Sequence, residues 1–252
     1  MLLAVFAMGC RQLLDIGTPI SDDGGEPTDA ARDAATDAHA DAPSSRPIFV
    51  QAGSITGTAG VGSELAVDLD QPLVTNDVLV VAVGAEGSGT ITFAVTDTAG
   101  TMFVAGAPEG GFQVLNAEMF YGEVVAGSAT DDVSVTFAGS ASALDVRVVQ
   151  YRNLATATAP VALDSHVSHA GSGLICTATV SVGSGGGLVV AADYSGTPTL
   201  AAGNGFTRRI TSSPDHGIVE DDYVDAQNVV IAECTLAAAA PWAMQALVFG
   251  VP

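Results

Sequence analysis

Short runs of alternating apolar and polar residues, separated by Gly, Asp, Asn and Ser, fill the chain from about residue 48 onward. Alternation with a period of two is the pattern of a half-buried β-strand. The runs predict strands at 64–69, 77–84, 90–96, 118–125, 132–138, 144–151, 174–182, 187–193, 205–211, 218–224, 228–236 and 242–249. No sustained helical period occurs outside the N-terminal segment, so we expect an all-β, antiparallel sandwich or barrel.

The two halves of this region repeat one another weakly. DVLVVAVG, FYGEVV and LDVRVVQY in the first half are followed, in the same order, by GLVVAADY, IVEDDYV and WAMQALVF in the second. With two copies and a period near 110 residues, the repeat is not a solenoid. Two similar antiparallel sheets folded face to face would give a jelly-roll-like β-sandwich, which we expect over residues 48–252.

Several short motifs within residues 50–250 resemble those of a known family. They are NDVLVV at 76–81, DTAG at 97–100, VVQYRNL at 148–154, LD at 163–164, GFTRR at 205–209 and WAM at 242–244. Together they resemble an uncharacterised β-sandwich domain of large secreted and surface proteins of bacteria, often found beside fibronectin-type modules. The family has no assigned catalytic residues, so the resemblance assigns none to this chain.

The N-terminal stretch MLLAVFAM is too short for a transmembrane helix and for a complete secretory signal. It leads into Ala7-Met8-Gly9-Cys10, which resembles the bacterial lipobox, where the cysteine is diacylated and becomes the mature N-terminus. We therefore expect residues 1–10 to be the remnant of a lipoprotein signal peptide whose true start lies upstream. Cys10 is then the lipidation site; the alternative is a fortuitous cysteine.

Residues 11–47 predict a disordered tether. Their main part, from Ser21 to Pro47, is rich in Asp, Ala, Pro, Gly and Ser and cannot bury enough apolar surface to offset the entropy of ordering. Aspartates at 29, 33, 37 and 41 would repel one another along one helix face, which favours an extended chain.

The charge balance limits the partners. The net charge is -21, and the seven basic residues are all Arg. Binding to nucleic acid needs a basic surface, and docking on anionic headgroups needs one too, so we expect neither. Acidity of this kind is typical of a protein that stays soluble outside the cell, and we expect a monomer in the cell envelope, at the outer membrane or the cell surface.

Two cysteines remain after Cys10. Cys176 and Cys234 each lie within a predicted strand, and a bridge between them would close a loop of 59 residues, counted from 176 to 234 inclusive. In an oxidising envelope such a pair can form a disulfide that stabilises the fold by about 4 kcal/mol. The alternative is two buried free thiols that act as small apolar side chains.

The densest acidic cluster of the folded region suggests a metal site. Glu220 and Asp222 share one strand face, and with Asp215 from the preceding loop they could offer oxygen ligands to Ca²⁺, the one cofactor we consider. A solvated acidic edge strand explains the same residues. His166 and His169 lie three apart on a strand and therefore point to opposite faces, so we interpret them as ordinary histidines.

Motifs for catalysis do not emerge. The chain has no Gly-x-Ser-x-Gly, no phosphate-binding Gly-rich loop ending in Lys and no His-Glu-x-x-His, so we assign no catalytic residue and expect no enzyme. Tyr121, Tyr223 and Phe206 are candidates for an aromatic ligand platform. We therefore expect a lipid-anchored lipoprotein with a binding or adhesion module, carbohydrate being one candidate ligand. The alternatives are a purely structural surface domain and a β-sandwich glycoside hydrolase or lyase.

Overall fold

The computed structural model describes residues 46–58, 64–107, 110–154, 161–212 and 217–250. Over these residues the chain forms fifteen β-strands, all paired antiparallel, so the all-β prediction is confirmed. This part of the chain contains no helix long and apolar enough to span a membrane. The strands are β1 (Ile48–Gly57), β2 (Glu64–Leu69), β3 (Val78–Gly87), β4 (Thr92–Asp97), β5 (Val104–Ala105), β6 (Gly110–Phe112), β7 (Leu115–Glu123), β8 (Asp131–Ala138), β9 (Ala141–Arg152), β10 (Leu163–Val182), β11 (Gly187–Ser195), β12 (Thr199–Ala202), β13 (Thr207–Thr211), β14 (Ile218–Val224) and β15 (Asn228–Gly250).

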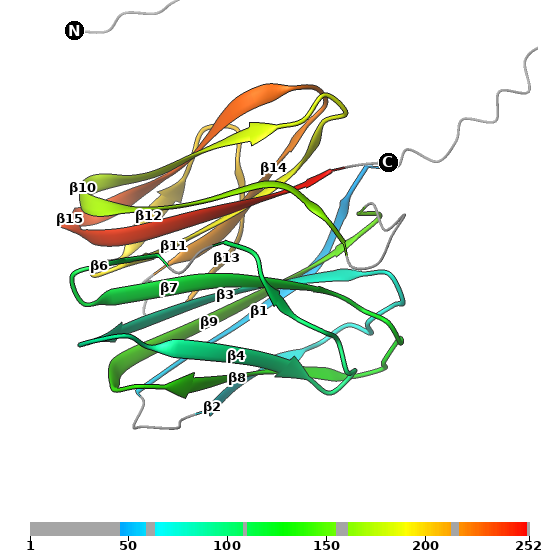
Figure 1. Ribbon diagram of the computed structural model, residues 1–252, viewed down its shortest axis with the longest axis horizontal. Helices are drawn as coiled ribbons and strands as arrows, with labels where there is room; N and C mark the ends of the chain where they lie inside the picture. Colours follow the sequence, from blue (N-terminus) through cyan, green and yellow to red (C-terminus); the bar gives the residue numbers. More distant parts are fainter. Residues whose placement is uncertain (1–45, 59–63, 108–109, 155–160, 213–216, 251–252) are drawn as a thin grey trace, which may run out of the picture. The chain divides into compact units, whose positions relative to one another are not determined.

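The first half of the described chain is a two-sheet sandwich with jelly-roll connections. Its larger sheet has the order β1-β9-β3-β7-β5, with β6 also on β7, and its smaller sheet has the order β2-β8-β4 (Figure 1). The two sheets enclose one apolar core, to which Leu79, Val81, Val146 and Val148 of the larger sheet contribute. We call the smaller sheet the first outer layer and the larger one the first inner layer.

The second half repeats this order with two long, bent strands. Residues 163–173 of β10 pair with 240–249 of β15, and after a register shift at Gly173 residues 175–182 pair with 228–235. The N-terminal part of β10, the C-terminal part of β15, β11, β14 and β13 form the second inner layer. The remaining parts of β10 and β15, with β12, form the second outer layer, and a separate core fills the space between the two.

The predicted similarity of the two halves is therefore present, but each half contributes two layers, where we expected one sheet from each. The reason lies in the inner strands: the first eight residues of β3 and all nine of β11 are buried. A strand that buries both faces needs a layer on each side. The result is a stack of four layers, which Figure 1 shows with the two inner layers adjacent.

The motif LVVA occurs at residues 79–82 and again at 188–191, but aligning the two copies is wrong by one residue in the structure. Leu79 lies in the core of the first half, whereas Leu188 lies between the halves. The structural counterpart of Leu188 is Val78, which faces the same interface. A slip of one residue turns every side chain of a strand to the opposite face. Aligning the identical residues of the two motifs therefore matched side chains that point to opposite faces.

The two halves pack through equivalent residues of their inner layers. The interface is apolar at its centre and resembles the contact of a symmetric dimer, in which the same patch is used twice. Its equivalent pairs, one residue from each half, are Val80 and Val190, Ala82 and Ala192, Val149 and Leu247, and Tyr151 and Phe249.

Candidate functional site

The two outer layers present very different faces to solvent, although their strands correspond. In the first outer layer Asp68 pairs with Asp132, and in the second the corresponding pair is Ser181 and Val229. The next outward pair is Ala66 with Ser134 in the first half, and Thr179 with Ile231 in the second. The first face is polar and acidic, and the second is aliphatic and rich in hydroxyl groups.

The apolar side chains of the second outer layer are truly open to solvent. Val229 is 62% exposed and Ile231 is 55% exposed, because the alternation of β15 turns them outward while Val230 and Ala232 fill the core. Five of the large apolar side chains that are exposed in the described chain lie on the strands of this layer, namely Leu174, Ile175, Leu200, Val229 and Ile231. We call the outward residues 175, 177, 179, 181, 200, 201, 229, 231, 233 and 235 the apolar outer face. The one charged residue among these ten is Glu233.

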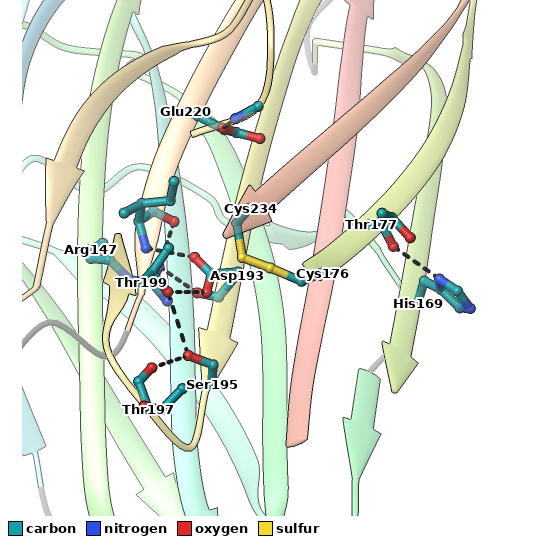
Figure 2. The surroundings of a disulfide bond; sticks show 12 residues. Arg147, His169, Cys176, Thr177, Asp193, Ser195, Thr197, Thr199, Glu220 and Cys234 are labelled. Atoms are coloured by element: carbon teal, nitrogen blue, oxygen red, sulfur yellow. Dashed lines mark hydrogen bonds between the residues drawn. A yellow bond between two sulfur atoms is a disulfide. The ribbon is translucent and has the colours of Figure 1, made fainter. Parts of the chain in front are cut away.

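A disulfide links the two long strands of this layer on its buried side. Cys176 and Cys234 lie directly opposite each other on β10 and β15, with their Cα atoms 5.0 Å apart, and they form the predicted disulfide (Figure 2). Both cysteines are fully buried in the core of the second half. The covalent link fixes the register of the two strands that carry Val229 and Ile231.

The second part of β10 forms an edge of this layer, and side chains from the first part of β10 bond to its carbonyl groups. Ser165 Oγ donates a hydrogen bond of 2.5 Å to the carbonyl oxygen of Ser181. His169 Nδ1 lies 2.9 Å from the carbonyl oxygen of Thr177 (Figure 2). The His169 ring also packs edge-on against Trp242. Because these edge carbonyls are satisfied, a partner would meet the face of the layer in preference to adding a strand at its edge.

A buried carboxyl group lies next to the disulfide. Asp193 Oδ1 accepts a hydrogen bond from the Ile218 amide, and its Oδ2 accepts one from Thr199 Oγ1, both at 2.7 Å (Figure 2). Burial raises the pKa of Asp193 to about 6, although nearby Arg147 lowers it. Ligand atoms of Cys176, Asp193 and Cys234 lie within 4.8 Å of one another. Since the two sulfur atoms are joined, they do not offer the thiolates that metals bind.

The residues proposed for calcium lie in a different environment from the one we expected. Glu220 is fully buried, and its Oε2 accepts a hydrogen bond of 2.8 Å from the Gly203 amide. Burial raises the pKa of Glu220 to about 8, so calcium would have to displace its proton at neutral pH. Asp222 is half-buried on the same face of β14, and Asp215 lies outside the described residues, as does the lipidation candidate Cys10.

The three aromatic residues proposed as a platform pack in three separate places. Tyr121 packs edge-on against Phe249 between the two halves. Tyr223 lies beneath the guanidinium of Arg46, which also pairs with Asp225 at 2.6 Å. Phe206 packs against the core of the second half.

Sequence reasoning missed a set of buried charged residues between the two halves. Arg147 is 1% exposed and donates hydrogen bonds of 2.6 Å to the carbonyl oxygens of Asp193 and Ile218. Its Nε also lies 3.1 Å from Asp145 Oδ2. The sequence did contain a sign of this burial, because Arg147 lies inside the largely apolar run LDVRVVQY in a chain with only seven basic residues.

A second polar group lies further along the same interface. Tyr151 donates a hydrogen bond of 2.6 Å to Asp221 Oδ2, and Arg209 Nε donates one of 2.8 Å to the same oxygen. The Arg209 guanidinium also lies over the Phe49 ring. These contacts join β9 and β1 of the first half to β13 and β14 of the second, and we assign them to the docking of the halves.

Comparisons with known proteins give no relative: no family model matches the chain, and no curated protein or solved structure matches it.

Proposed function

We propose that this protein is a cell-envelope lipoprotein, anchored through Cys10, that binds a partner through its apolar outer face. The disulfide supports an oxidising compartment, because such bonds persist in secreted and periplasmic proteins. The net charge of -21 supports a protein that stays soluble beyond its anchor. The acidic segment between Cys10 and β1 would hold the folded part away from the membrane.

The contrast between the two outer layers carries the proposal. At corresponding outward positions the first half has Asp132 and Ser134, whereas the second half has Val229 and Ile231. Exposed aliphatic side chains grouped on one face are typical of an interaction surface. Because the two halves share a fold, the fold itself does not require this difference.

A protein is the partner that fits this face best. The ten outward residues include no aromatic side chain, and sugar-binding surfaces depend on aromatic rings. An exposed face of Val, Ile and Thr instead complements another apolar protein surface. Binding of carbohydrate would need the rings of Tyr121, Tyr223 or Phe206, which lie in separate places.

The binding face is tested by photo-crosslinking in the native cells. A benzoylphenylalanine residue replaces Ile231 in one version of the full chain and Ser134 in the other, so the two probes occupy corresponding positions. We expect a discrete crosslinked product from position 231 and none from position 134. Equal products from both positions, or none from position 231, would refute the binding face.

The anchor is tested separately by intact mass and membrane fractionation of the full chain with its native upstream region. We expect a diacylglyceryl mass on Cys10 and recovery with membranes, and we expect a Cys10→Ala version to lose both. An unmodified, soluble wild-type protein would refute the anchor, whatever the crosslinking shows.

A further inference from the structure

The turn that follows β4 brings two aspartates and a threonine together. Asp131, at the start of β8, accepts hydrogen bonds at Oδ1 from Thr98 Oγ1 at 2.7 Å and from the Ala99 amide at 3.0 Å. Asp97 Oδ1 accepts one of 2.7 Å from the Thr101 amide. The side chains of Asp97 and Asp131 are therefore both bound to the turn of residues 97–101.

Three oxygen atoms at this turn are buried and have no hydrogen-bond partner. They are Asp97 Oδ2, Asp131 Oδ2 and Thr101 Oγ1. Asp131 is 1% exposed and Thr101 is 7% exposed, so both side chains are shielded from bulk solvent. A buried polar atom without a partner is costly, so each such atom in a native protein needs an explanation, such as a bound water or ion.

The described part of the chain supplies no cation to this turn. Its five arginines have their contacts elsewhere, namely Arg46 with Asp225, Arg147 with Asp145, Arg152 with Asp77, Arg209 with Asp221 and Arg208 with the Leu200 carbonyl. Asp97 pairs with Val133, which lies two residues from Asp131 on β8, so the side chains of Asp97 and Asp131 are diagonal neighbours on one face of this sheet. Two carboxyl groups thus lie close together without a basic side chain to balance them.

We propose that Asp97, Asp131 and Thr101 bind a hard divalent cation, with Ca²⁺ as the preferred ion. Carboxylate and hydroxyl oxygens are hard ligands, and Ca²⁺ accepts six to eight of them in flexible geometry. A cation between the two carboxyl groups would balance their charge and would give the buried Asp131 Oδ2 a partner. It would also join the turn after β4 to the start of β8, and the ion can arrive from the solvent side, where Thr98 and Gly100 are exposed.

The described residues of the second half do not repeat this set of ligands, so we expect no second site of this kind there. Asn228 occupies the position in β15 that corresponds to Asp131 in β8, since Val229 corresponds to Asp132. The turn that corresponds to 97–101 precedes Phe206 and reads Gly203-Asn204-Gly205, with no carboxylate. Both turns are followed by a phenylalanine packed on the core of its own half, Phe103 or Phe206.

The test is calorimetric titration of the full chain with Ca²⁺ after removal of metals with EDTA, together with thermal unfolding with and without Ca²⁺. Three variants are compared with the wild type: Asp131→Asn, Asp97→Asn and the control Asp132→Asn. The control removes the same charge one residue away, on the solvent face of β8. Asparagine keeps an acceptor oxygen for the Thr98 and Ala99 donors, so the turn keeps its internal hydrogen bonds.

We expect a single Ca²⁺ site and a higher unfolding temperature with Ca²⁺ in the wild type and in the Asp132→Asn control. We expect Asp131→Asn and Asp97→Asn to weaken binding by about tenfold or more, because affinity depends on the number of charged ligands. Asp97 is only half-buried, so the Asp97→Asn variant still tests the proposal if Asp131→Asn does not fold. The proposal is overturned if Ca²⁺ neither binds nor raises the unfolding temperature of the wild type, or if both turn variants bind it as well as the control does.

Discussion

Replacement of Glu220 by glutamine should stabilise the protein at neutral and alkaline pH. Glu220 is fully buried and keeps its proton up to a pKa of about 8, compared with an ordinary value of 4.5. Between these two values the folded protein binds a proton that the unfolded chain has released, so stability falls as pH rises. Glutamine is neutral at every pH and can still accept the hydrogen bond from the Gly203 amide.

The size of the effect follows from the two pKa values. Each pH unit between 4.5 and 8 costs the wild type about 1.4 kcal/mol of unfolding free energy. The cost is therefore about 3 kcal/mol at pH 7 and about 5 kcal/mol above pH 8. Near pH 4.5 it vanishes, and there the Glu220→Gln variant should match the wild type.

Urea unfolding at pH 5, 7 and 8.5 measures this difference, with Glu64→Gln on the first outer layer as the exposed control. Asp193 also titrates in the fold, with a pKa of about 6, and its charge is one of the causes that raise the pKa of Glu220. The reasoning fails if Glu220→Gln loses stability between pH 5 and 8.5 as steeply as the wild type and the control.

Three further changes test the disulfide of the second half and two contacts between the halves. Removing the disulfide by Cys176→Ala with Cys234→Ala should cost about 4 kcal/mol of unfolding free energy from chain entropy, and reducing agent should then have no further effect on the melting temperature. Tyr151→Phe should cost about 1–3 kcal/mol in urea unfolding because Asp221 loses a buried donor, whereas Tyr223→Phe should change little; equal effects would contradict this. Gly84→Ala should lower the melting temperature because the added methyl group would overlap the Tyr194 ring, and Gly196→Ala, where the nearest atom is 3.6 Å away, should not.

The sequence predicted most strands because their alternation or apolar runs are strong. The predicted 64–69 and 218–224 coincide with β2 and β14. The first part of β10 was missed because residues 163–173 are mostly polar or small, as suits an edge strand whose side chains bond to its own second part. The predicted 228–236 and 242–249 are one strand, β15, because pairing with β10 continues past the bend.

The candidate site was harder to predict, since it depends on which face of a strand is covered. Val229, Val230 and Ile231 read together as a fully buried strand, and only the order of the layers shows that Val229 and Ile231 face solvent. Glu220 presents the opposite case, because an acidic residue in an acidic run reads as exposed. It lies instead at the position that corresponds to the buried Phe120 of the first half.

The pairing of equivalent inner layers has a consequence for how such a protein diversifies. A symmetric dimer of one jelly roll would necessarily display the same outer surface twice, so any change that suited a ligand on one side would recur on the other. Here both jelly rolls lie in one chain, and their association does not depend on protein concentration. Each outer layer can then change independently while the shared interface keeps the two in a fixed ratio; here one is acidic and the other is aliphatic.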